Sequence, residues 1–138
     1  MKKPLIYIIF LVIILIIIGF LVYNSLYKCY FVKDSGIGES CWTKFAVDKK
    51  DVSICDKIKD FQLINNCYIE IAQEKGDITI CDTFYDKAVK DYPGEIASGD
   101  TGIKDGCYQF VADSTKDSSI CAKIQREDFR NNCYSIVK

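Results

Sequence analysis

Residues 67–84 read Cys67-Tyr-Ile-Glu-Ile-Ala-Gln-Glu-Lys-Gly-Asp-Ile-Thr-Ile-Cys-Asp-Thr-Phe84, and this stretch decides the fold. Apolar residues at offsets 0, 1, 4 and 5 from Cys67 form one stripe, which predicts a helix over about residues 62–75. Gly76 is typical of a helix end. The Asp-x-Thr that follows supplies a cap for a second helix of about two turns, and Thr79 with Asp82 has the spacing of a capping box. We therefore expect a helical hairpin.

The hairpin is one copy of a repeat that the cysteines mark. They lie at positions 29, 41, 55, 67, 81, 107, 121 and 133, so their separations alternate between 12 and 14 and are broken once by 26. Three copies of a 26-residue unit begin at Cys41, Cys67 and Cys107, with a half unit at each end and a 14-residue insertion in the second copy. A self-similar unit of this length predicts an all-α array of short helical hairpins.

Two sets of disulfides compete. Helix geometry favours links from the second helix of one unit to the first helix of the next, because Cys55 and Cys67 are then level across an antiparallel hairpin. The rival link from Cys67 to Cys81 offsets the two residues by roughly 7 Å along the helix axes, and the rival set leaves two cysteines unpaired. The favoured pairs are Cys29 with Cys41, Cys55 with Cys67, Cys81 with Cys107, and Cys121 with Cys133.

A long apolar segment precedes the repeats. Residues 4–23 carry no charge, and about 20 helical residues span the roughly 30 Å of hydrocarbon in a bilayer. A cleaved signal peptide is the alternative, but bulky residues occupy 20–23, where a cleavage site needs small ones. Lys2 and Lys3 favour a cytoplasmic amino terminus. We expect a cytoplasmic tail at 1–3, a transmembrane helix at 4–23 and an extracytoplasmic domain at 24–138, where disulfides are stable.

Composition excludes several classes of chemistry. The chain has no histidine, which excludes the nucleophile pairs and metal sites that use imidazole. No two cysteines are closer than 12 residues, so the Cys-x-x-Cys element of thioredoxin-like centres and zinc ribbons is missing. After residue 23, 16 of the 18 cations and all 19 anions are interspersed, which disfavours nucleic acid as a partner. We predict no catalytic residue, metal ligand or cofactor.

The insertion is the irregular part of the array, and we expect a long loop over about residues 86–106. Pro93-Gly94 and three later glycines favour this interpretation. Long loops on rigid scaffolds often carry binding residues, although an insertion can also be tolerated without a role. The candidate binding residues are Asp91, Tyr92, Glu95, Asp100 and Asp105. The carboxylates of this loop do not have EF-hand spacing.

The pattern Cys-Tyr-x-x-x-Ala followed by Asp-x-Ser-Ile-Cys-x-x-Ile resembles the repeats of membrane-anchored, cysteine-rich helical-hairpin proteins of archaea. The resemblance covers residues 29–138. Because that family has no assigned activity, the resemblance implies an architecture and no catalytic residue. The architecture is also similar to Sel1-like cysteine-rich proteins and mitochondrial twin-cysteine hairpins, whose cysteine spacings differ.

These observations predict a non-enzymatic, single-pass membrane protein that presents a binding or structural module outside the cytoplasm. The expected partners are the bilayer, through residues 4–23, and another protein on the extracytoplasmic side. Two alternatives stay open. A thiol-disulfide redox protein would use one reducible cysteine pair, and a cytoplasmic-facing domain would use cysteines as metal ligands.

Overall fold

The computed structural model describes residues 3–30, 35–97 and 99–137, and before residue 38 it describes the side chains of residues 7–20 and Cys29. The chain divides into two compact units, and the boundary lies between Cys41 and Trp42. Every regular element of the described residues is helical, which confirms the prediction of an all-α fold.

The first unit contains α1 (Lys3–Tyr30) and the beginning of α2 (Ser35–Lys49). A disulfide joins Cys29 to Cys41, with the two Cα atoms 5.4 Å apart. All side chains of residues 7–20 are exposed. Among the described residues, no helix combines the length and the apolar character that crossing a membrane requires. The ends of the predicted segment, residues 4–6 and 21–23, lie outside the described side chains, and the transmembrane helix stays a prediction.

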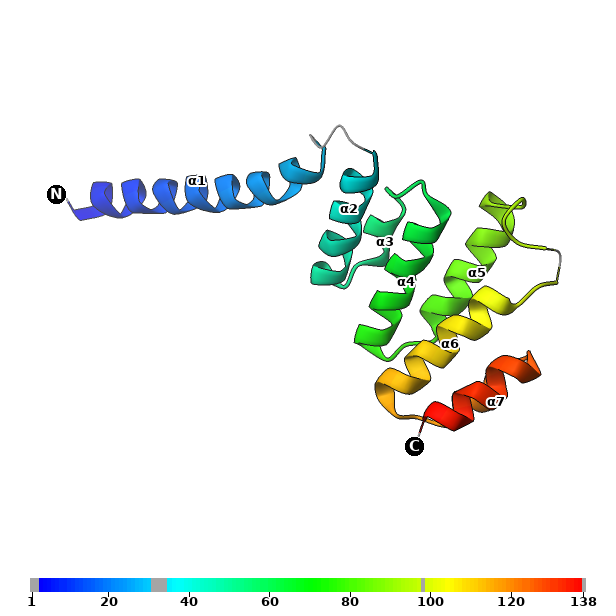
Figure 1. Cartoon of the computed structure of the whole chain (residues 1–138). Coiled ribbons are helices and arrows are strands. Elements are labelled where there is room, and N and C mark those ends of the chain that lie inside the picture. The colour runs from blue at the N-terminus through cyan, green and yellow to red at the C-terminus, as the bar shows by residue number, and fades with distance from the viewer. Residues whose placement is uncertain (1–2, 31–34, 98, 138) are drawn as a thin grey trace. The chain divides into compact units, whose positions relative to one another are not determined.

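The second unit is built from two layers of helical elements (Figure 1). We call α2, α4 (Phe61–Lys75), α6 (Gly102–Thr115) and α7 (Glu127–Ile136) the A helices, since they come first in each repeat. The B segments are α3 (Val52–Cys55), α5 (Thr79–Asp91) and the 3-10 turn η1 (Cys121–Lys123). Helix α6 packs between α4 and α7 in the A layer. Each B segment packs on the A helix that follows it, and α5 and η1 pack also on the A helix before them.

The A helices form as the apolar stripe predicts. In α4 the carboxylate of Asp60 caps the amino end by accepting a hydrogen bond from the Leu63 amide at 2.9 Å. The residues at offsets 0, 1, 4 and 5 are all buried, and they are Cys67, Tyr68, Ile71 and Ala72. The same offsets are buried in α6, at Cys107, Tyr108, Val111 and Ala112. The core of each repeat therefore consists of one such stripe packed on the B segments.

The B segments differ from the two-turn helix that we expected, and this prediction is wrong in every copy. Helix α3 has 4 residues, η1 has 3 and α5 has 13. In the short copies the chain turns at a buried isoleucine three residues after the cysteine, Ile58 or Ile124. In α5 the corresponding residue is Phe84, and the next residue on that stripe, Ala88, is also buried. The apolar face thus continues, and the helix continues with it.

The long loop expected over residues 86–106 is also wrong. Helix α5 runs to Asp91 and α6 begins at Gly102, so only residues 92–101 lie outside the helices. Glycine in this stretch does not always mean a turn. Gly106 lies within α6, and a Cβ atom on it would be 3.4 Å from the ring of Phe129 in α7, an ordinary van der Waals distance, so this glycine lies where the two A helices pack.

The residue nine positions after the first cysteine of each repeat has a left-handed backbone. It is Gly76 in the second copy, with φ 62°, and lysine in the others, Lys50 with φ 53° and Lys116 with φ 57°. This conformation costs a side chain with a Cβ atom about 1 kcal/mol or more. The two lysines therefore hold backbone strain that glycine relieves in the middle copy.

We expect Lys116→Gly to raise the free energy of unfolding by about 0.5–1 kcal/mol, because glycine adopts this conformation without steric cost. The matched control is Lys116→Ala, which loses the same exposed ion pair to Asp113 and keeps the Cβ atom. Chemical denaturation of both variants checks the prediction. A gain in the alanine variant equal to that in the glycine variant contradicts it.

Candidate functional site

The disulfides position the A helices, because each A helix carries one cysteine of a bonded pair. All eight cysteines are bonded, with Cα separations of 5.4 to 5.9 Å and no free thiol. The pairs are those that the helix geometry favours, and the prediction that the cysteines form disulfides is confirmed. Thiolate chemistry, whether redox or metal binding, requires one of these bonds to open first.

A tyrosine–aspartate hydrogen bond lies beside two of the disulfides. The Tyr68 hydroxyl donates to Asp56 at 2.9 Å, and the Tyr108 hydroxyl donates to Asp82 at 2.7 Å. Each aspartate follows the first cysteine of a bonded pair, and each tyrosine follows the second. Burial, and then the hydrogen bond to the carboxylate, raises the pKa of both tyrosines well above the ordinary value near 10.

The capping box predicted from Thr79 with Asp82 is wrong. The aspartate that opens each Asp-x-Ser/Thr motif accepts the hydrogen bonds from the serine or threonine two residues later. In the first copy Asp51 accepts from the Ser53 amide at 3.0 Å and from its hydroxyl at 2.7 Å. The Ser53 hydroxyl and then its amide lower the pKa of the Asp51 carboxyl.

The last repeat lacks the tyrosine–aspartate bond. Ala122 follows Cys121 where the other copies have aspartate, and Tyr134, which follows Cys133, is 48% exposed. The outward residues of α7 include exposed Asp128, Asn131 and Asn132.

We expect Tyr68 and Tyr108 to lose their protons only well above pH 10, because ionising either tyrosine puts a phenolate beside an aspartate. The pKa of each tyrosine is higher in the folded state than in the unfolded state. The protonated tyrosines therefore contribute their full share to the free energy of unfolding below about pH 10, and this contribution is lost as the pH rises further. Absorbance at 295 nm during an alkaline titration measures the ionisation. Replacing both residues by phenylalanine should remove the late step, and Tyr134→Phe should leave it in place.

Three of the predicted binding residues lie around the end of α5. Asp91 is within hydrogen-bond distance of Lys87, with 3.0 Å between the nitrogen and oxygen atoms. The Tyr92 ring lies 5.3 Å from the ring of Phe61, centroid to centroid. Glu95 is exposed. Asp91 and Tyr92 thus make contacts at the end of α5, and their role in binding stays a prediction.

The other two predicted binding residues secure the start of α6. Asp100 accepts from the Gly102 amide at 2.8 Å and lies 3.6 Å from the Arg126 guanidinium. Asp105 is fully buried and accepts from Thr101 Oγ1 at 2.7 Å and from the Gln125 and Arg126 amides at 3.0 Å each. The prediction that Asp105 belongs to a binding loop is wrong, because this carboxylate is buried, lies in α6 and caps the turn before α7.

The position of Asp105, two residues before the A-helix cysteine, is Asn65 in the second copy. Asn65 Oδ1 is buried and makes no hydrogen bond within the described part of the chain. The amides that correspond to those of Gln125 and Arg126 belong to Tyr85 and Asp86, which are inside α5. In the second copy α5 continues through these residues, so there is no turn at which the Asn65 side chain could accept hydrogen bonds as Asp105 does.

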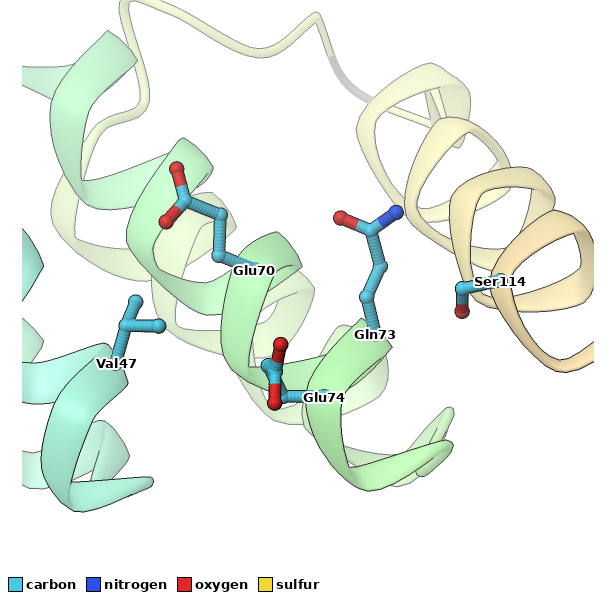
Figure 2. A pocket seen from close by; sticks show the side chains of 5 residues that line it. All are labelled: Val47, Glu70, Gln73, Glu74 and Ser114. Atoms are coloured by element: carbon cyan, nitrogen blue, oxygen red, sulfur yellow. The ribbon is translucent and has the colours of Figure 1, made fainter.

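The A helices leave one face open, which we call the A-helix face and define by offsets 3, 6 and 7 after the cysteine. The face consists of Lys44, Val47, Asp48, Glu70, Gln73, Glu74, Phe110, Asp113 and Ser114, all exposed or half-buried. An open hollow of about 460 Å³ lies in this face, between the side chains that Figure 2 shows. It is lined by Val47 of α2, by Glu70, Gln73 and Glu74 of α4, and by Ser114 of α6.

A second hollow lies between α6 and α7, lined by Gln109, Asp128, Phe129 and Asn132. The Arg126 guanidinium lies over the Phe129 ring, 4.8 Å from the ring centroid. Arg126 also forms an ion pair with Asp128 at 2.7 Å. The two charged groups are therefore already engaged with each other. The A-helix hollow has the larger volume and draws on three repeats, so it is the better candidate for a binding surface.

Within the described residues, no three cysteine, aspartate or glutamate side chains gather as metal ligands would. Comparison of the chain with protein-family models, with curated proteins and with solved structures finds no match. Neither the disulfides nor the tyrosine–aspartate bonds form a nucleophile beside a base, which hydrolytic catalysis needs. The arrangement can hold helices rigidly and present their outer surface.

Proposed function

We propose that the chain is a non-enzymatic binding module, held by a membrane helix at residues 4–23 on the extracytoplasmic side of a membrane. The observation that carries the proposal is the complete pairing of the eight cysteines beneath an open A-helix face. Structural disulfides persist in oxidising compartments and are rare in the cytoplasm. Arrays of helical repeats commonly bind partners on an extended, concave face.

Helix α1 supports the membrane part of the proposal. Its side chains over residues 7–20 are uncharged and all exposed, with Tyr7 at 77%. Soluble monomers rarely expose a contiguous apolar surface of this kind, and a bilayer would cover it. Lys2 and Lys3 before the segment favour a cytoplasmic amino terminus, which places the repeats on the other side.

Differences between the repeats support the binding part. Two positions of the apolar stripe do not vary, since offset 0 is cysteine and offset 5 is alanine in all three full copies, at Ala46, Ala72 and Ala112. The open positions do vary, because offset 3 is Lys44, Glu70 or Phe110. A shared core beneath a variable face fits a scaffold whose surface has been adapted to a partner.

The experiment alkylates the full chain in detergent, without and with prior reduction, and then measures the intact mass. We expect no alkylation before reduction and eight alkylated cysteines after it. In intact cells, a membrane-impermeant maleimide should label the cysteines only after an impermeant reductant has been added. Thiols that alkylate freely, or labelling that requires cell lysis, would contradict the proposal and favour a redox or cytoplasmic metal-binding protein.

A further inference from the structure

The hollow in the A-helix face has a chemistry that defines its occupant. We propose that it binds a basic segment of another protein, with a lysine or arginine side chain against Glu70 and Glu74 and an apolar side chain against Phe110. This proposal rests on the function proposed above and names the partner's chemistry.

Charge complementarity selects the basic occupant. Glu70 and Glu74 line the hollow and no cationic side chain does. Glu70 has no ion pair among the described residues. Glu74 is 3.2 Å from Lys50, but both side chains are about half exposed, so this pair is weak and an incoming cation can share the carboxylate. Figure 2 shows Glu70 and Glu74 on successive turns of α4 beside the hollow.

The two carboxylates are a feature of this repeat alone. Residues at i and i+4 on a helix are neighbours, and two like charges there destabilise the helix. The corresponding residues are Lys44 and Asp48 in α2, with opposite charges, and Phe110 and Ser114 in α6. Only α4 therefore carries the repulsion that a bound cation would relieve.

Apolar side chains beside the hollow favour a polypeptide over a free cation. Phe110 is 50% exposed on the A-helix face, and its backbone carbonyl oxygen accepts a hydrogen bond from Gln73 Nε2 at 3.4 Å, so its backbone lies beside a residue that lines the hollow. Val47 lines the opposite side. An open, largely polar surface does not suit an apolar small molecule, which needs an enclosed apolar pocket. A basic segment with an apolar residue nearby satisfies both kinds of surface.

The test measures fluorescence anisotropy of a labelled peptide of alternating lysine and alanine with one leucine. The full chain is held in nanodiscs of phosphatidylcholine, which carry no net charge. We expect Glu70→Gln with Glu74→Gln to weaken binding at least fivefold. The control, Asp86→Asn with Glu127→Gln, removes two exposed carboxylates elsewhere and should weaken binding less than twofold. Phe110→Ala should weaken binding about threefold, and salt should weaken it in the wild type.

Three outcomes would overturn the inference: no binding of the peptide, equal loss in the two double variants, or complete displacement of the peptide by millimolar calcium. Self-association of the wild type that Glu70→Gln with Glu74→Gln abolishes would assign the face to a second copy instead. Resistance of each variant to alkylation shows that it is folded and oxidised. The thiol-labelling experiment uses no variant of this face, so failure of the proposed function is detected separately.

Discussion

Replacing Cys55 and Cys67 together by alanine should lower the free energy of unfolding by about 3 kcal/mol. The bond closes a ring with a sequence separation of 12, and opening it returns that much conformational entropy to the unfolded chain. Helix α3 has only 4 residues and cannot form without help, so it should melt first. Alanine is preferred to serine because both sulfur positions are fully buried, where a hydroxyl would lack a partner.

Denaturant unfolding of the purified full chain, followed by circular dichroism, measures this loss. The comparison variant replaces Cys81 and Cys107 by alanine and opens the ring with a separation of 26. Doubling a loop adds only about 0.6 kcal/mol of closure entropy, so the two variants should differ by about that amount. A loss below about 1 kcal/mol for either pair would show that the disulfides do not hold the array together.

Replacing Asp105 by alanine should cost about 3 kcal/mol, although the substitution touches no disulfide. The carboxylate is fully buried and accepts three hydrogen bonds. Alanine leaves the amides of Gln125 and Arg126 without this acceptor, and a hydrogen bond to a charged group contributes about 1.5–3 kcal/mol. The turn before α7 should become more mobile once these hydrogen bonds are lost.

The control for Asp105 lies in the same helix. Asp113 forms an exposed ion pair with Lys116, so Asp113→Ala should change the free energy of unfolding by less than about 0.5 kcal/mol. Asp105→Asn keeps one acceptor oxygen, so its loss in the free energy of unfolding should lie between those of Asp105→Ala and Asp113→Ala. Hydrogen exchange should show faster exchange at the Gln125 and Arg126 amides in Asp105→Ala. Equal stability of the Asp105 and Asp113 variants would refute the capping role.

Cysteine spacing predicts the A helices and the disulfides well, because both depend on local periodicity. A stripe at offsets 0, 1, 4 and 5 leaves little choice of helix, and Cys55 and Cys67 fit a hairpin in only one way. The sequence is less informative where tertiary contacts override local preference. Gly106 looks like a loop residue, yet it lies within α6, beside the Phe129 ring of α7.

The hollow in the A-helix face could not be predicted because its lining is not continuous in the sequence. Val47, Glu70 and Ser114 come from three repeats, and each alone is an ordinary exposed helix residue. Asp105 misleads for a related reason, since a carboxylate among glycines suggests solvent. Its partners, Gln125 and Arg126, follow 20 and 21 residues later, beyond the range of any local pattern.

The order of the disulfides has a consequence for biogenesis. Each bond joins consecutive cysteines along the chain, first to second, third to fourth, and so on, with no crossing or nesting. A chain that is translocated as it is synthesised, at about 5–20 residues per second, presents each cysteine to its correct partner before the next one emerges. Rapid oxidation then produces the native connectivity directly. Maturation of this protein should accordingly depend on an oxidase and not on a disulfide isomerase.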